Sequence, residues 1–211
     1  DPRSGCRTPA GTTIAHADLL LRVPRFVDAH RPQVILRLGE PPASKVLAQW
    51  TASSGARLVV VDPDGAWVDP ERLAAEIVSA DPSSWCRAVV AVLRSEAGGA
   101  GTGGRADEEW LESWAAADAA ADTAVATALA RHDGLTEPGV AREIVEASPT
   151  GSCLVVSSSM PIRDVEWFAG SRRGLRVLAN RGANGIDGVV STAVGVALSG
   201  TPTTLLIGDV A

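Results

Sequence analysis

The chain has 211 residues, of which 45% are hydrophobic, and a formal net charge of −6 at pH 7. This length allows one large domain or two small ones with a sizeable core, and the negative charge argues against a general attraction to nucleic acid or anionic membranes. No apolar run is long enough to span a membrane, and we expect no secretory signal at the start. Cys6, Cys86 and Cys153 are odd in number and lack metal-binding spacing, so we expect buried free thiols in a reducing cytoplasm.

The first half of the chain alternates between helical and extended patterns after an irregular start. Apolar residues at helical spacing predict a helix over 14–30, which Pro24 interrupts. Ser44 has the chemistry of a helix N-cap and predicts a helix that follows it. The remaining elements expected here are strands at 34–39 and 57–61, a helix at 83–96, and a segment at 73–78 that fits either a strand or a helix.

Residues 98–104 read GGAGTGG and predict a flexible joint. They contain a formal G-x-G-x-x-G at Gly99, Gly101 and Gly104, which in dinucleotide-binding proteins follows a strand and opens a helix. No strand pattern precedes it here, so a linker is the favoured interpretation. We therefore predict one domain over 1–97, a linker over 98–105 and a second domain over 106–211.

The second half of the chain repeats the order of helix and strand. Strands are expected at 153–156, 175–179 and 203–207, and helices at 107–132, after the N-cap Thr136, at 162–168 and at 186–198. Short apolar strands that alternate with helices indicate an α/β fold whose parallel sheets are flanked by helices. Ligands of such sheets bind at the carboxyl ends of the strands, so we searched those ends for functional residues.

The strand at 153–156 ends in a serine run, with Arg163 one helical turn later. Hydroxyls and free N–H groups at a helix N-terminus favour an anion, and a guanidinium binds a carboxylate through two parallel hydrogen bonds. Ser158 and Ser159 are therefore candidate binding residues together with Arg163. The alternative is that one serine merely caps the helix and Arg163 is a surface charge.

The strands at 175–179 and 203–207 also end in distinctive loops. Arg181 opens a glycine-rich loop in which Ile186 could pack against a ring, although a tight turn with core packing explains both residues as well. Asp187 could cap the helix that follows. Gly208 and Asp209 follow the last strand, and a carboxylate there is a common Mg²⁺ ligand, although Gly-Asp pairs are frequent in turns.

Other polar residues give weaker signals. Lys45 opens a predicted helix, where a cation opposes the helix dipole, and this small cost suggests a binding role beside the plainer interpretation of a surface lysine. The histidines at 16, 30 and 132 are scattered and form no catalytic pattern, so we expect them on the surface.

Several of these segments together resemble the SEPHCHC synthase family, thiamine-diphosphate-dependent enzymes of the menaquinone pathway. The segments SSMPIRD, NRGANGIDG, STA and GD at 158–164, 180–188, 191–193 and 208–209 carry the resemblance. The pairs at 44–45 and 49–50 and the stretch 62–70 resemble the central domain of that family. NRGANGIDG is the most specific part, and the resemblance covers most of the chain.

The resemblance implies a reaction in which 2-oxoglutarate is decarboxylated and its succinyl unit is added to isochorismate, with thiamine diphosphate as the electron sink and Mg²⁺ or Mn²⁺ as the metal. Substrate-binding roles then fall to Lys45, Ser159, Arg163 and Arg181. Cofactor-binding roles fall to Ser158, Ser159, Ile186, Gly208 and Asp209, and Asp209 is also the metal ligand. The fold implied is two partial Rossmann-like domains of a thiamine enzyme.

The family's members are much longer than this chain. We expect a fragment: part of the central domain over 1–97 and the N-terminal part of the diphosphate-binding domain over 106–211. Such a fragment should be inactive alone and bind thiamine diphosphate weakly, and its cytoplasmic parent should be a homodimer or homotetramer. The alternative is a stand-alone α/β module that binds a nucleotide or a small anion, or a scaffold domain without catalysis.

Overall fold

The computed structural model describes residues 1–66, 68–97, 108–180 and 187–209 and divides the chain into two compact units. One unit joins Asp1–Leu20 to Leu111–Ala211, and the other consists of Leu21–Trp110. The predicted linker at 98–105 lies outside the described residues. The compact units differ from the predicted domains in one respect. Residues 1–20, which were predicted to belong to the first domain, pack with the second half of the chain.

The unit Leu21–Trp110 is built on a three-stranded parallel sheet of order β1-β2-β3. Its strands are β1 (Val34–Leu38), β2 (Arg57–Val61) and β3 (Ala74–Val78), and its helices include α2 (Pro24–Ala29), α3 (Lys45–Ser53) and α4 (Pro82–Ala97). The central strand β2 is buried from Leu58 onward. The segment at 73–78, which fitted either element, is a strand because it pairs with β2.

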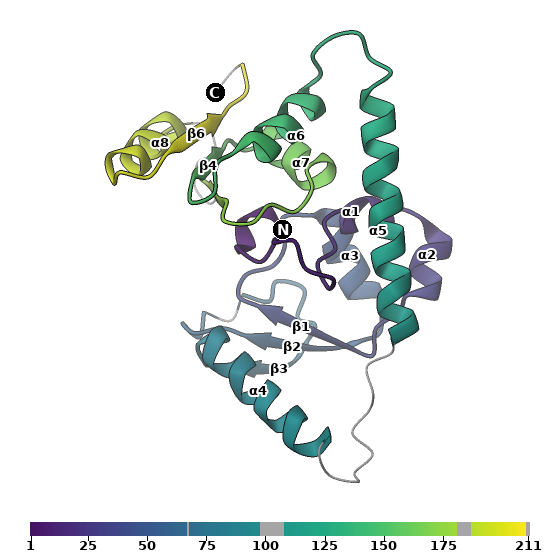
Figure 1. Ribbon diagram of the computed structural model, residues 1–211. Coiled ribbons are helices and arrows are strands. Elements are labelled where there is room, and N and C mark those ends of the chain that lie inside the picture. The colour runs from purple at the N-terminus through teal and green to yellow at the C-terminus, as the bar shows by residue number, and fades with distance from the viewer. Residues whose placement is uncertain (67, 98–107, 181–186, 210–211) are drawn as a thin grey trace. The chain divides into compact units, whose positions relative to one another are not determined.

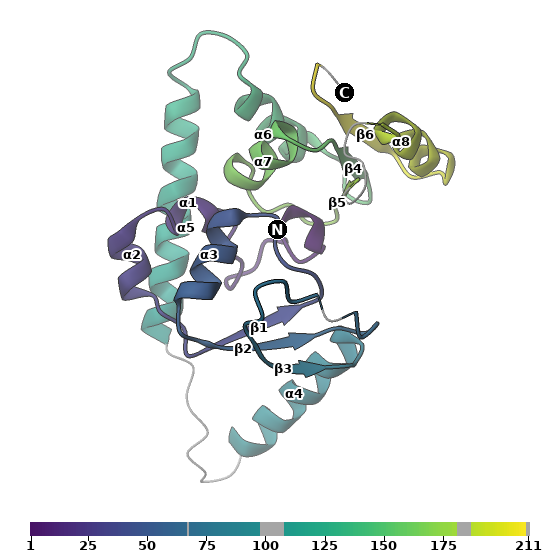
Figure 2. The same ribbon diagram turned by 180° about the vertical axis from the view of Figure 1, so that it is seen from behind.

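The other unit holds a second parallel sheet, of order β5-β4-β6. Its elements are η1 (Pro2–Ser4), α1 (Ala17–Leu20), α5 (Glu108–Leu129), α6 (Glu137–Ala147), β4 (Cys153–Val156), α7 (Met160–Phe168), β5 (Arg176–Ala179), α8 (Val189–Leu198) and β6 (Thr203–Leu206). The sheet is flanked by helices, as Figures 1 and 2 show from opposite sides. Both units confirm the predicted α/β class.

The central strand β4 divides the core of this unit into two layers, because successive side chains of a strand point to opposite faces. Leu154 and Val156 pack with buried residues of α6, α7 and β5. Cys153 and Val155 pack with Val189 and Ala193 of α8. All four residues of β4 are buried. The sheet is therefore covered on both faces, which explains why β4 reads as a continuous apolar run.

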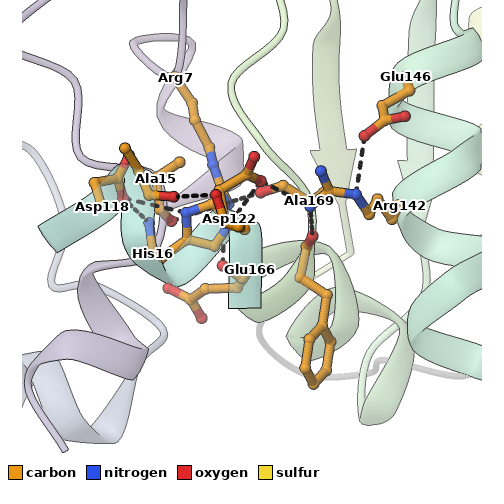
Figure 3. Close-up of polar contacts among 12 residues, drawn as sticks. Arg7, Ala15, His16, Asp118, Asp122, Arg142, Glu146, Glu166 and Ala169 are labelled. Carbon is orange, nitrogen blue, oxygen red and sulfur yellow. Dashed lines mark hydrogen bonds and ion pairs between the residues drawn. The ribbon is translucent and has the colours of Figure 1, made fainter. Parts of the chain in front are cut away.

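A polar network joins residues 1–20 to the second half of the chain (Figure 3). The Arg7 guanidinium donates to the carbonyls of Ala15 at 2.8 Å, Glu166 at 3.1 Å and Val165 at 3.2 Å, and also to that of Ala169. Burial is the main reason that the pKa of Arg7 falls to about 10, which leaves it charged at neutral pH. These bonds fix the N-terminal segment against the end of α7.

His16 forms the second part of this network. Its side chain is 1% exposed, and its backbone N–H donates to Asp118 Oδ1 of α5 at 2.7 Å, while its Nδ1 lies 3.2 Å from the same oxygen. Burial acts to raise the pKa of Asp118, but the hydrogen bonds from His16 outweigh it and the net shift is downward. The expectation of surface histidines is therefore wrong for His16, and also for His30, which is 7% exposed.

Local sequence signals account for several helix ends. The hydroxyls of Ser44 and Thr136 accept the N–H groups of Leu47 at 3.0 Å and Gly139 at 3.1 Å, so both predicted N-caps are confirmed. Helix α8 differs, since its N-cap is Gly188 at φ 81° and not the predicted Asp187. The cysteines are free as expected, but only Cys153 is buried, whereas Cys6 is exposed.

Candidate functional site

The carboxyl ends of β4, β5 and β6 meet at one edge of the sheet. The last residues of the strands are in register, because Val156 of β4 pairs with Ala179 of β5 and with Leu206 of β6. Beyond this row the Ser158 hydroxyl donates to the Asn180 carbonyl at 3.2 Å. The prediction that these three strand ends share an edge is confirmed for the residues that the structure describes.

A cavity of about 530 Å³ lies at this edge. Its polar walls include the serines at 157–159 after β4, Gly208 and Asp209 after β6, and Glu137 and Asp164 from α6 and α7. Apolar residues of β6 and of the first turns of α6 and α7 complete it. The structure thus brings four predicted binding residues into one cavity: Ser158, Ser159, Gly208 and Asp209.

Ser159 connects β4 to α7 in a strained conformation. Its φ is 73° and its ψ is −124°, a region that residues other than glycine rarely adopt and that costs on the order of 1–3 kcal/mol. Although Ser159 occupies the N-cap position, its side chain makes no capping bond. The Ser158 hydroxyl is used by Asn180, so neither serine acts as the simple cap of the alternative interpretation. The first turn of α7 therefore offers the backbone N–H groups of Met160 and Ile162 to an anion, whereas Pro161 between them has no N–H.

The other predicted site residues do not join this cavity among the described residues. Arg163 is exposed on α7 and lies outside the cavity lining, with its Nη1 3.9 Å from the sulfur of Met160. Lys45 is the exposed first residue of α3, in the other compact unit. Arg181 and Ile186 lie outside the described residues.

Two carboxylates of the cavity carried no predicted role. Asp164 is 3% exposed, and its Oδ1 has no hydrogen-bond partner in the described part of the chain. Burial, with a smaller contribution from the charge of Glu137, raises the pKa of Asp164 from 3.8 to about 6. No local signal identified Asp164, because it lies between the exposed Arg163 and the core residue Val165.

The described residues contain neither a cluster of metal-binding side chains nor a membrane-spanning helix. Within 1–66, 68–97, 108–180 and 187–209, no group of three or more His, Cys, Asp or Glu side chains is arranged to hold a metal ion. Asp209 is exposed, so a cation bound there would need further oxygen ligands beyond it. None of the helices in these ranges has both the length and the apolar character needed to cross a membrane.

Comparison with known proteins gives several similar relatives with the same name. The chain is 43% identical over 201 residues to the 2-succinyl-5-enolpyruvyl-6-hydroxy-3-cyclohexene-1-carboxylate synthase (SEPHCHC synthase) of Myxococcus xanthus, a match that covers 94% of this chain and 33% of the relative. It is 42% identical over 199 residues to the synthase of Sorangium cellulosum, covering 92% and 31%, and 39% identical over 218 residues to that of Halobacterium salinarum, covering 100% and 34%. Over nearly its whole length the chain is therefore homologous to about a third of a SEPHCHC synthase.

The match to the SEPHCHC synthases is partial in length. The chain spans about a third of the length of the curated relatives it matches. No family model matches the chain. The cavity beyond β4 and β6 lies within the aligned third, because the Halobacterium match covers the whole chain.

Proposed function

We propose that this chain forms the part of a SEPHCHC synthase that contributes one wall of the cofactor and substrate site. In this proposal the whole enzyme decarboxylates 2-oxoglutarate and adds the succinyl unit to isochorismate, with thiamine diphosphate and Mg²⁺ or Mn²⁺. One observation supports it above all: Ser158, Ser159, Gly208 and Asp209 line one cavity at the carboxyl edge of a parallel sheet. The family relationship supplies the identity of the reaction.

The residues of the cavity fit an anionic cofactor that is bound through a hard cation. The first-turn N–H groups of α7 and the nearby serine hydroxyls suit a diphosphate, because aligned N–H groups and the helix dipole favour negative charge. The carboxylate of Asp209 suits Mg²⁺, which prefers oxygen ligands and keeps several waters. In this proposal Ser158, Gly208 and Asp209 hold the diphosphate and its cation.

In this proposal cationic residues bind the substrate carboxylates. Thiamine diphosphate supplies an electron sink for decarboxylation when it is bound. The exposed guanidinium of Arg163 is free to bind a substrate carboxylate with two parallel hydrogen bonds, and we assign the same task to Arg181. Ser159 would position the substrate beside the cofactor, Ile186 would support the cofactor rings, and Lys45 would contribute a further cation.

The proposal is tested in a chimera, because the chain spans a third of its relatives. The matching third of the Myxococcus xanthus synthase is replaced by this chain, and isochorismate-dependent consumption of 2-oxoglutarate is measured. We expect activity in the chimera and none from this chain alone with thiamine diphosphate and Mg²⁺. Arg163→Ala should raise KM for a dicarboxylate substrate by at least about tenfold, because a charged hydrogen-bonding pair is lost.

The control is Arg173→Ala, which removes an exposed arginine whose hydrogen bond is to the Pro9 carbonyl at 3.4 Å. It should leave KM unchanged. A folded chimera that binds the cofactor but forms no product would contradict the proposal. Tight binding of NAD or FAD to this chain in calorimetry would instead favour the stand-alone binding module. The dimer or tetramer expected for the parent stays a prediction.

A further inference from the structure

Asp164 occupies an unusual position for a carboxyl group. It lies in the second turn of α7 and lines the cavity, and only 3% of its surface is exposed to solvent. Its Oδ1 is buried without a hydrogen-bond partner among the described residues. Because a buried charge without a donor is costly, this oxygen needs either a proton or a donor supplied from the cavity.

The charges that face Asp164 are also acidic. Glu137, at the start of α6, adds to the effect of burial and raises the pKa of Asp164 to about 6, while burial is the larger cause. Asp209 contributes a third carboxylate to the lining. No Lys, Arg or His of the described ranges lines the cavity. The cationic residue next to Asp164 on the same helix, Arg163, is exposed and lies outside the cavity lining. An ionised Asp164 therefore opposes any anion that enters.

The rest of the same cavity favours an anion. The first turn of α7 has no side-chain cap, and the hydroxyls at 157–159 lie beside it. A protonated Asp164 resolves the conflict, since a neutral carboxyl group neither repels an anion nor leaves its own oxygen charged in an apolar site. Its O–H then becomes a hydrogen-bond donor to the ligand.

We propose that Asp164 is a ligand-binding residue that is protonated when the cavity holds an anion, so that anion binding takes up one proton. This inference rests on the proposed function, because it assumes that the cavity at the start of α7 is an anion site. It adds a binding residue and a proton to that site. The ligand of this cavity would be a multiply charged oxyanion that carries either phosphate or carboxylate groups.

The linkage predicts a defined dependence on pH. Below about pH 5.5 the free protein already carries the proton, and affinity should not change with pH. Above about pH 7 the proton must be taken from solvent, and affinity should fall by about tenfold for each pH unit. A neutral side chain at position 164 should remove this dependence.

The experiment uses inorganic sulfate as the probe, because its charge is constant over this range. Amide chemical shifts of Ser158 and Gly208 are followed by NMR at several pH values, and the side-chain carboxyl carbon of Asp164 reports its protonation. Wild type should bind more weakly by about tenfold at pH 8 than at pH 7. Asp164→Asn is isosteric and donates a hydrogen bond through its amide, so it should bind sulfate equally at pH 7 and pH 8. At pH 8 it should bind sulfate at least about tenfold more tightly than wild type.

Two variants on α6 provide matched controls. Glu137→Gln removes the like charge in the cavity and should move the start of the pH dependence to lower pH. Glu143→Gln removes an exposed carboxylate of the same helix outside the cavity and should leave the pH dependence of sulfate affinity unchanged. Repetition with 2-oxoglutarate distinguishes a carboxylate ligand from a phosphate-like one.

The possible failures can be told apart. Binding that is independent of pH in wild type, or a pH dependence that persists in Asp164→Asn, overturns this inference and leaves the anion site intact. The absence of shifts at Ser158 and Gly208 at every pH overturns the inference together with the anion site of the proposed function.

Discussion

The two ends of α7 (Met160–Phe168) differ in how their backbone groups are satisfied. At the C-terminal end, Arg7 donates to the carbonyls of Val165, Glu166 and Ala169, and Arg142 donates to that of Phe168 at 3.1 Å. At the N-terminal end, the Ser159 side chain makes no capping bond.

In the proposed function this difference gives one end of the helix a structural task and the other end a binding task. Two cations at the C-terminal end complement the helix dipole as well as its free carbonyls. Arg142 is itself held by Asp122 at 2.8 Å, and this carboxylate raises its pKa, so it stays charged. The well-satisfied end fixes the helix, and the open end keeps N–H groups available at the cavity.

The largest effect should come from breaking the satisfied end. Arg7→Met removes the donor to four carbonyls, and at about 1 kcal/mol for each net bond the free energy of unfolding should fall by about 4 kcal/mol. Urea denaturation measures the change, with Arg173→Met as an exposed arginine control that should cost less than about 0.5 kcal/mol. Equal losses in the two variants would show that Arg7 does not anchor α7.

A smaller effect should come from the buried carboxyl near the open end. The raised pKa of Asp164 means that folding favours its neutral form, so its contribution to stability is present at low pH and is lost as pH rises from 3.8 through about 6. This contribution amounts to up to about 3 kcal/mol. Relative to wild type, Asp164→Asn should therefore gain stability by up to that amount between about pH 4 and pH 7.

Urea denaturation of both proteins at the two pH values tests this expectation. Comparison with the variant isolates Asp164 from carboxylates such as Asp118, whose lowered pKa gives the opposite dependence on pH. Glu143→Gln serves as a control that should follow wild type. Parallel curves for Asp164→Asn and wild type would contradict the burial of an unpartnered carboxyl.

The smallest effect concerns the strained residue itself. Ser159→Gly should raise the free energy of unfolding by about 1 kcal/mol, because glycine adopts a φ of 73° without steric strain. Ser158→Gly is the matched control and should lower it, since the hydrogen bond to Asn180 is lost and no strain is relieved. Destabilisation by Ser159→Gly as large as that by Ser158→Gly would argue against strain at this position.

Much of the site could be predicted because it depends on topology. Parallel strands place their carboxyl ends at one edge, so Ser158, Ser159, Gly208 and Asp209 were expected together. Asp164 received no predicted role, because adjacent helix residues point about 100° apart and the position of Arg163 in the sequence does not show what its neighbour faces. The predicted helix start at 162 also differs from the observed start at Met160.

The parts that could not be predicted depend on contacts between distant residues. The burial of His16 requires Asp118, which lies 102 positions later in the sequence. Arg7 similarly binds carbonyls more than 150 positions away. No local pattern reports such pairs, so residues 1–20 were assigned to the first half of the chain, whereas they pack with the second.

We propose that the open end of α7 binds an anion. Backbone amide shifts of this chain on addition of millimolar thiamine diphosphate with Mg²⁺ test this most directly. We expect shifts at Ser158, Ser159, Gly208 and Asp209 and none at Val165 or Ala169, and we expect Asp209→Asn to weaken them. Shifts confined to the arginine-bonded end of α7, or no shifts at the open end, would contradict an anion site there.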